Sequence, residues 1–401
     1  MPKLDIAIAG AGPAGLAAAL ALHRDGHKVR IFERFETARP IGSGLMLQPT
    51  GQAMLAELGL FEPIRSLGHP LDRLIGHDAR SGRVVLDMAY AKLPGLGRGL
   101  GVHRAALFDV LHDAVVAEGI EVATGRTISG SEPGWLRFGA ERAGYFDLVV
   151  DAMGAASPLR PALRAPGQNR ALPFGAIWGT VPWVAEGFDG AALTQRYERA
   201  NVMIGVMPIG RQRPEGPQLA AFFWSLRWQE HQALVSGGFG PWRERVQSLW
   251  PETAPHLSAI GGFESLTLAK YQHQTAGLPI GERLVAIGDA AHSTSPQLGQ
   301  GANMALLDVR ALTLALRRNA DVGDALEDYA QLRRWHVRLY QALSLTLTPF
   351  YQSDSRWLPI LRDILVPIAT TVPPLPQFLA ALVAGRLLYP LRTLELKPVQ
   401  L

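Results

Sequence analysis

The first strongly patterned part of the chain predicts a strand, a glycine-rich turn and a helix. Residues 4–9 (LDIAIA) alternate in polarity as a short strand does. GAGPAG follows, and then LAAALALHRDG, whose alanines and leucines are strong helix formers. KVRIFER predicts a second strand. The pattern therefore indicates a β-turn-α-turn-β unit within about 30 residues, the size of a parallel crossover.

The middle of the chain changes from helical periodicity to strand patterns. Helices are expected at residues 51–59 and 104–118, on either side of short strands and turns at 70–97. From residue 172 to 275, aromatic-rich runs (FGAIWGTVPW, ANVMIGVMPI, QLAAFFWSLRW) alternate with Gly and Pro clusters and predict an antiparallel sheet. RLVAI at 283–287 predicts a buried strand. A long helical region then runs from residue 301 to 346, interrupted near 319–323.

The last 50 residues are strongly apolar but interrupted. Arg362, Asp363, Arg386 and five prolines between residues 359 and 376 break the run. Neither half reaches the roughly 20 uninterrupted apolar residues that a membrane span needs, so we expect no transmembrane segment. A helical cap on the core is the preferred interpretation, and contact with a membrane surface or another subunit is the alternative.

Composition narrows the class of protein. With 401 residues and 48% hydrophobic residues, the chain is long enough for two packed domains. The 39 basic and 35 acidic residues form no basic stripe, which argues against nucleic-acid binding but allows a small anionic ligand. The absence of cysteine excludes disulfides and thiolate metal sites, and we expect no metal centre. The N-terminus lacks a secretory pattern, so a cytoplasmic location is the default expectation.

Gly10, Gly12 and Gly15 form a G-x-G-x-x-G motif between the first strand and the Ala-rich helix. In this context the first glycine makes a tight turn, the second admits a pyrophosphate and the third lets the helix pack on the strand. Glu33 ends the second strand 18 residues later, where a carboxylate accepts ribose hydroxyls and repels a 2'-phosphate. The motif predicts an unphosphorylated adenosine, as in FAD or NAD. A plain tight turn is the alternative.

Residues 288–308, GDAAHSTSPQLGQGANMALLD, combine small residues with the start of an apolar helix. Asp289 directly follows a strand, where its carboxylate can accept hydrogen bonds from hydroxyls. Gly299 and Gly301 precede the helix, so backbone amides and the helix dipole would stabilise negative charge on a flat ring such as isoalloxazine. One extended ligand would span from the Gly10 turn to this helix.

Three segments together resemble the single-component FAD-dependent aromatic hydroxylases, the para-hydroxybenzoate hydroxylase-like class A flavoprotein monooxygenases. They are GAGPAGLAAALALHRDGHKVRIFER, HRAALFDVL and GDAAHSTSPQLGQGANMALLD, within residues 4–346. The resemblance implies that Glu33 binds the ribose, Arg104 neighbours the pyrophosphate and Asp289 binds the ribityl chain. It also implies a flavin-ring loop at Pro296–Gly301 and a mobile segment beside the flavin at Gly42–Gly44. We therefore expect FAD contacts from Gly10, Gly12, Pro13, Ala14, Gly15, Glu33, Arg34, Gly42, Ser43, Gly44, Arg104, Asp289, Pro296, Gly299, Gly301, Ala302 and Asn303.

One motif departs from the family. The family's D-G-x-x-S-x-x-R pattern reads Met153-Gly154 here, with Ser157 and Arg160 retained. Because that motif is linked in the family to flavin and nicotinamide placement, the missing acid weakens the expectation for the reductive half-reaction. Asp151 lies two residues earlier, and we expect little compensation from it.

The fold class expected is α/β, with a Rossmann-like FAD-binding domain on a mostly parallel sheet. An antiparallel-sheet substrate domain and a helical C-terminal segment complete it. The FAD-binding domain would be discontinuous, made of residues 1–70, 98–171 and 276–346. The substrate domain would comprise 71–97 and 172–275, and the cap 347–401.

The resemblance implies a monooxygenase that hydroxylates or epoxidises an aromatic or other electron-rich small molecule through a flavin C4a-hydroperoxide, with NADH or NADPH as transient donor and O2 as oxidant. A partner reductase or a homodimer stays open. Trp178, Trp224 and Trp228 are candidates for stacking on a substrate, with ordinary sheet core as the alternative. His292 is a weaker substrate candidate, with a structural hydrogen bond preferred. No catalytic residue is assigned.

Other functions compete with this interpretation. A flavin halogenase would show a W-x-W-x-I-P pattern, which is absent. An FAD-dependent reductase acting on a prenyl-type substrate fits the apolar tail. A non-catalytic FAD-binding protein is the third candidate, because the family acid is missing at Met153.

Overall fold

The computed structural model describes residues 2–37 and 42–399. A six-stranded sheet in the order β18-β19-β12-β1-β2-β8 forms one half of the molecule. Every neighbouring pair is parallel except β18 and β19. The strands are β1 (Asp5–Ala9), β2 (Lys28–Phe32), β8 (Glu121–Ala123), β12 (Leu148–Asp151), β18 (Ile280–Gly281) and β19 (Leu284–Ala286).

Helices bury this sheet. Seven consecutive residues of α1, from Leu16 to Leu22, are buried, because the helix packs on the sheet and is covered by α4 and α9. Its small and apolar sequence suits an element without a solvent face. The break predicted near residue 319 separates α9 from α10, and Asp321 caps α10 by accepting the backbone N–H of Gly323 and Asp324. The helices are α1 (Pro13–Arg24), α4 (Arg104–Ala117), α9 (Gly301–Arg318) and α10 (Val322–Tyr351).

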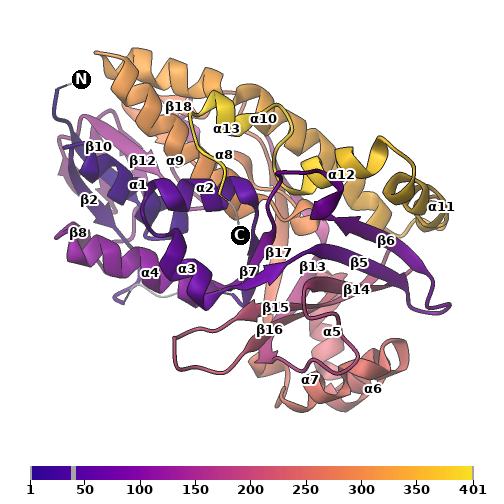
Figure 1. The fold of residues 1–401 in the computed structure, drawn as a ribbon. Coiled ribbons are helices and arrows are strands. Elements are labelled where there is room, and N and C mark those ends of the chain that lie inside the picture. Colours follow the sequence, from indigo (N-terminus) through magenta and orange to yellow (C-terminus); the bar gives the residue numbers. More distant parts are fainter. Residues whose placement is uncertain (1, 38–41, 400–401) are drawn as a thin grey trace.

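A seven-stranded sheet in the order β17-β13-β16-β15-β14-β5-β6 forms the other half. It is antiparallel except for the parallel pair β5 and β14. Figure 1 shows α5, α6 and α7 on the side of this sheet away from α9 and α10. The elements are β5 (Arg73–Asp78), β6 (Val84–Ala89), β13 (Asn169–Pro182), β14 (Ala192–Glu198), β15 (Val202–Gly210), β16 (Leu219–Arg227), β17 (Thr267–Gln274), α5 (His231–Ser236), α6 (Phe239–Leu249) and α7 (Ala254–Ser258).

Two small sheets complete the β-structure, in the orders β3-β7-β4 and β11-β10-β9. The first joins the halves, because β7 packs against β15 while β3 leads into α2. These elements are β3 (Gly44–Leu47), β4 (His69–Leu71), β7 (Gly99–His103), β9 (Gly130–Glu132), β10 (Trp135–Phe138), β11 (Glu141–Gly144), α2 (Pro49–Glu57), α3 (Phe61–Leu67) and the short α8 (Asp289–His292).

The C-terminal segment is helical, with α11 (Leu358–Thr371), α12 (Leu375–Val383) and α13 (Pro390–Thr393). Within the described residues, no single helix is long and apolar enough to cross a membrane. The pair α11 and α12 meets those criteria only when taken together, and it is bent by 100°. The fold class predicted from the sequence is confirmed: a mostly parallel sheet, an antiparallel sheet and C-terminal helices. The domain boundaries stay a prediction.

Candidate cofactor and substrate site

The glycine turn after β1 has the geometry its spacing predicts. Gly10 has φ +101°, and a Cβ atom there would lie 2.9 Å from the carbonyl oxygen of Ala152. A Cβ on Gly15 would lie 2.0 Å from the carbonyl oxygen of Gly10, so α1 packs directly on the turn. A Cβ on Gly12 would meet no atom within 4 Å. Two glycines thus serve close packing, and the middle one borders open space where a pyrophosphate fits.

Glu33 lies at the end of β2 with its carboxylate turned back toward this turn. Oε2 accepts the backbone N–H of Ala11 at 2.8 Å, and Oε1 accepts that of Phe35 at 3.1 Å. Each carboxylate oxygen has a further lone pair for a ribose hydroxyl. Arg34 is exposed, with its guanidinium carbon 4.7 Å from the centre of the Phe35 ring.

The second predicted cofactor segment begins beside the first. Gly288 has φ +58°, and a Cβ there would lie 3.0 Å from the Cβ of Ala305 and 3.6 Å from that of Ala14. The starts of α1 and α9 therefore meet at Gly288. A Cβ on Gly301 would lie 3.9 Å from Oδ1 of Asp289, and Gly299 is left-handed with φ +60°. This adjacency allows one dinucleotide to reach both segments.

The side chain of Asp289 is exposed to solvent, although many protein atoms lie around its carboxyl group. Desolvation raises the pKa of its carboxyl, and the charges of His292 and Arg104 oppose that rise. Among the described residues, its carboxylate accepts no hydrogen bond from the protein. An accessible acceptor without a protein donor suits ribityl hydroxyls.

The segment from Gly42 to Gly44 is held between the two halves. The Ser43 carbonyl accepts the N–H of Arg104 at 2.8 Å, and Ser43 Oγ donates to the carbonyl of Gly179 at 2.9 Å. At Gly42, φ is +104° and a Cβ would lie 3.0 Å from Cδ of Arg104. Arg104 thus lies beside this segment and close enough to Asp289 to affect its pKa. His103 makes a local contact, because Nδ1 accepts the N–H of Ala105 and caps α4.

The remaining flavin-loop residues divide by accessibility. Pro296 is exposed at the start of a short 3-10 helix, and Ala302 is half-buried in the first turn of α9. Asn303 is fully buried: Oδ1 accepts the N–H of Gln48 at 2.8 Å, and Nδ2 donates to the carbonyls of Met46 and Gly299. It fixes the loop to β3 and α2, so its side chain positions the site from within the protein.

Trp178 and Trp224 lie on opposite faces of the antiparallel sheet. Trp178 pairs in register with Phe223, and its indole N–H donates to the Tyr271 hydroxyl at 3.1 Å. It lies two residues before Thr180, which contacts Ser43, so Trp178 lies on the same face of the sheet as the Gly42–Gly44 segment. Trp224 is buried against Trp242 of α6, with ring centres 6.2 Å apart. The structure therefore places Trp224 in the sheet core, the alternative to a substrate contact.

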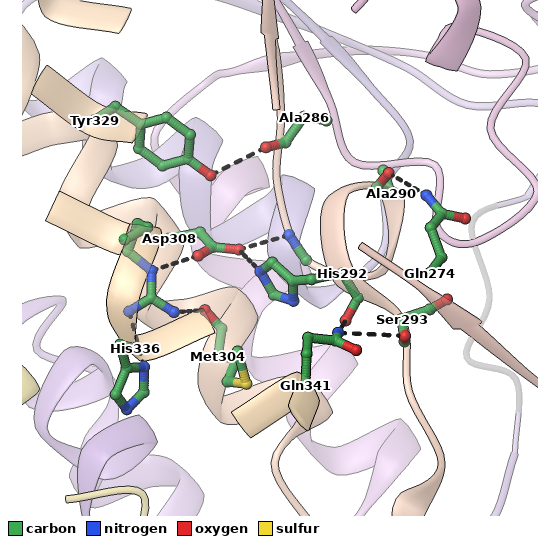
Figure 2. A network of polar contacts seen from close by, with 12 residues as sticks. Gln274, Ala286, Ala290, His292, Ser293, Met304, Asp308, Tyr329, His336 and Gln341 are labelled. Atoms are coloured by element: carbon green, nitrogen blue, oxygen red, sulfur yellow. Dashed lines mark hydrogen bonds and ion pairs between the residues drawn. The ribbon is translucent and has the colours of Figure 1, made fainter. Parts of the chain in front are cut away.

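A buried ionic network contacts the start of the 288–308 segment from the protein interior (Figure 2). Asp308 Oδ2 accepts the N–H of Gly288 at 2.8 Å and lies 2.6 Å from Nε2 of His292. Its Oδ1 accepts Nε–H of Arg333 at 2.6 Å. Although burial alone would raise the pKa of Asp308, His292 and Arg333 lower it to about 2. His292 thus makes the structural contact rather than facing a substrate. The indole N–H of Trp228 likewise donates a hydrogen bond to the carbonyl of Leu172.

The long helix α10 is fixed at several points along the same network. The Tyr329 hydroxyl donates to the carbonyl of Ala286 at 3.0 Å, and Gln341 donates to the carbonyl of His292 at 2.7 Å. Together with Arg333, these contacts tie α10 to β19, α9 and the loop. Sequence reasoning did not identify Asp308. A lone acid at a buried position of an apolar helix was the signal available.

Asp151 is engaged inside the turn that replaces the family motif. It is fully buried, Oδ2 accepts the Ser157 hydroxyl at 2.6 Å, and Oδ1 accepts the N–H of Met153 at 3.1 Å. Burial raises its pKa to about 6. Both oxygens of Asp151 therefore hold the Met153 turn.

The geometry fits FAD, with an open glycine turn, a ribose acceptor, an accessible second carboxylate and an amide-rich helix start. Comparison with known proteins decides the family. Residues 3–340 match the family model described as FAD binding domain. A 6-methylpretetramide 4-monooxygenase from Streptomyces rimosus is 30% identical over 82% of this chain and 80% of its own length. The chain belongs to the FAD-dependent monooxygenase family.

One further curated relative and one solved structure are also similar to this chain. An FAD-dependent urate hydroxylase from Klebsiella pneumoniae subsp. pneumoniae is 26% identical, covering 82% of this chain and 86% of its own. The crystal structure of Klebsiella pneumoniae HpxO complexed with FAD and uric acid superposes with a TM-score of 0.79. It is 22% identical and covers 95% of this chain and 97% of its own, which shows a shared fold. The FAD predicted from the sequence is thereby confirmed, whereas the individual contact residues stay predictions.

Proposed function

We propose that this flavoprotein monooxygenase hydroxylates an aromatic or heteroaromatic small molecule, with NADH or NADPH as electron donor and O2 as oxidant. The observation that carries the proposal is the contact between Ser43 and β13 at Gly179, one residue from Trp178. Through it, a segment expected to border the flavin lies next to an aromatic pair, Trp178 and Tyr271. Flat rings stack well on such side chains.

Arg104 supplies a positive charge between the two parts of the proposed site. It opposes the raised pKa of both Asp289 and Tyr271, so it lies near each. Desolvation is the main cause of the raised pKa of Tyr271, so its hydroxyl stays protonated and can donate a hydrogen bond to a substrate oxygen. An anionic substrate or the FAD pyrophosphate would gain from Arg104.

Bound FAD supplies the redox chemistry that activates O2. The protein's own part is binding, orientation and exclusion of water. Glu33 and Asp289 would hold the hydroxyl-bearing parts, and the amide-lined start of α9 would stabilise negative charge on the reduced ring. Asp308 keeps that start in place through Gly288.

The electron donor is the finer part of the proposal. The turn at Met153 lacks the family acid, and Asp151 is engaged with Ser157, so direct reduction by NADH or NADPH and reduction by a partner reductase both fit. Stopped-flow reduction of the bound flavin by each nicotinamide, with and without a reductase, separates the two routes.

A screen of phenolic and heteroaromatic acids tests the function. With the correct substrate, NAD(P)H oxidation and O2 uptake accelerate together and an oxygenated product forms. If a substrate accelerates NAD(P)H oxidation equally with and without O2, the result would favour a prenyl-type reductase. Retained yellow flavin that no donor reduces would favour a non-catalytic FAD-binding protein.

A further inference from the structure

The outward face of α11 is apolar, and its inward face holds the charge. Trp357, Ile360, Leu361, Ile364, Leu365 and Ile368 follow i, i+3, i+4, i+7 spacing, and all are exposed. Trp357 is 79% exposed and Ile364 54%. Arg362, in contrast, is buried between the rings of Tyr197 and Tyr351. A surface helix normally has the opposite orientation.

The apolar stripe continues past the end of α11 at Val372 and onto α12 at Leu375 and Phe378, and all three residues are exposed. Figure 1 shows both helices at the outer edge of the molecule, beside β5 and β6. The inner face of α12 packs with Ala380 and Ala384 against the second half, so folding does not require the outer residues. A contiguous apolar stripe of this length is typical of an interaction surface.

The charged residues near this stripe indicate which kind of partner it binds. Residues 330–401 contain eight Lys and Arg and three Asp and Glu, and of these eight cations Arg333 and Arg362 are buried. Arg356 directly precedes Trp357, and Arg83 donates to the carbonyl of Asp363. Neither arginine pairs with a carboxylate among the described residues. Exposed cations beside an apolar stripe match anionic lipid headgroups.

We propose that α11 and α12 dock the protein on the surface of an anionic lipid bilayer. The 14 residues of α11 make a helix of about 21 Å, too short to cross a hydrocarbon core of about 30 Å, so the helix lies in the plane of the interface. Trp357 at its N-terminus fits the headgroup region. A second copy is the weaker occupant, because a two-fold contact through this face would bring the unpaired cations of both copies together.

Vesicle flotation of the full-length, FAD-loaded protein tests the proposal. Vesicles of phosphatidylcholine with about one third phosphatidylglycerol are compared with phosphatidylcholine alone. The protein should float with the anionic vesicles. The triple variant Ile360→Ser, Ile364→Ser, Ile368→Ser should bind these vesicles at least about tenfold more weakly, because it loses methylene groups that would insert into the bilayer. Arg83→Gln with Arg356→Gln should remove the preference for anionic vesicles.

Val116→Ser is the matched control, because Val116 is 58% exposed on α4, and it should float like the wild type. Unchanged FAD content and melting temperature show that each variant is folded. Absence of wild-type flotation, or equal flotation of the triple variant, would overturn the proposal. So would a wild-type dimer in analytical ultracentrifugation that the triple variant converts to monomer, since a second copy would then cover the stripe.

Discussion

Asp308 on α9 and Arg333 on α10 form a buried ion pair, with 2.6 Å between Oδ1 and Nε. Through its other oxygen, Asp308 also accepts the N–H of Gly288, the residue at which the starts of α1 and α9 meet. One carboxylate therefore links the long helix α10 to the loop predicted to carry the flavin ring. Stability and cofactor binding should be coupled at this point.

Replacing Asp308 with asparagine should lower the free energy of unfolding by about 3–5 kcal/mol, because Arg333 would keep its burial and lose its counter-charge. The exposed pair of Arg317 and Asp25, which involves the same helix, is the control. Arg317→Gln should cost no more than about 1 kcal/mol. Urea unfolding of both variants measures the two losses. Equal losses in the free energy of unfolding would show that the buried pair stabilises the protein no more than the exposed pair does.

The three glycines of the first turn should separate folding from FAD binding. Gly12→Ala should keep the wild-type melting temperature, because its Cβ meets no atom, and should weaken FAD binding about tenfold or more. Gly15→Ala should lower stability by about 1–3 kcal/mol, because its Cβ meets the Gly10 carbonyl. Fluorescence titration with FAD and thermal unfolding measure the two effects. Wild-type FAD affinity in Gly12→Ala would show that the pyrophosphate does not bind at this turn.

Asp151 should make the protein less stable as pH rises. Its folded pKa of about 6 exceeds the unfolded value of 3.8, so the folded state binds the proton more tightly. The stabilisation is fully present below pH 3.8 and is lost as pH rises through about 6, by about 2–3 kcal/mol in total. Asp151→Asn should remove this contribution, which unfolding measured from pH 4 to 8 checks against the wild type. Identical pH profiles would contradict the assignment.

The two tryptophans on opposite sheet faces should respond differently. Trp178→Ala should reduce kcat/KM for the substrate about tenfold or more while FAD content stays unchanged, because one stacking surface is lost. Trp224→Ala should instead lower stability by about 3–5 kcal/mol, as truncation of a buried aromatic does. Steady-state kinetics and melting curves distinguish them. If both variants lose only stability, Trp178 belongs to the core as well.

Local spacing made the cofactor segments predictable. The β1–α1 turn, Glu33 and the loop before α9 each depend on residues close in sequence, where glycine position and helix start determine the backbone. Boundaries were less accurate: the helix expected at 51–59 begins at Pro49, because proline suits the first helical position. The short helix α3 was not predicted.

Long-range pairings could not be predicted from periodicity. The contacts of Ser43 with Gly179 and of Trp178 with Tyr271 join segments 136 and 93 residues apart. Period-two alternation shows that Trp178 and Trp224 face some core, but not which side of the sheet each occupies. For α11, the sequence favoured a cap on the core and left contact with a membrane surface or another subunit as the alternative, since its pattern also fits a buried helix.

A crystal structure of the protein with FAD would show whether one cofactor reaches both the Gly10 turn and the start of α9. We expect one extended FAD, with the adenosine ribose at Glu33, the pyrophosphate over Gly12 and the isoalloxazine ring at the start of α9 beside Gly299 and Gly301. Density for FAD elsewhere, or adenosine at Glu33 with the ring far from α9, would show that this binding mode is wrong.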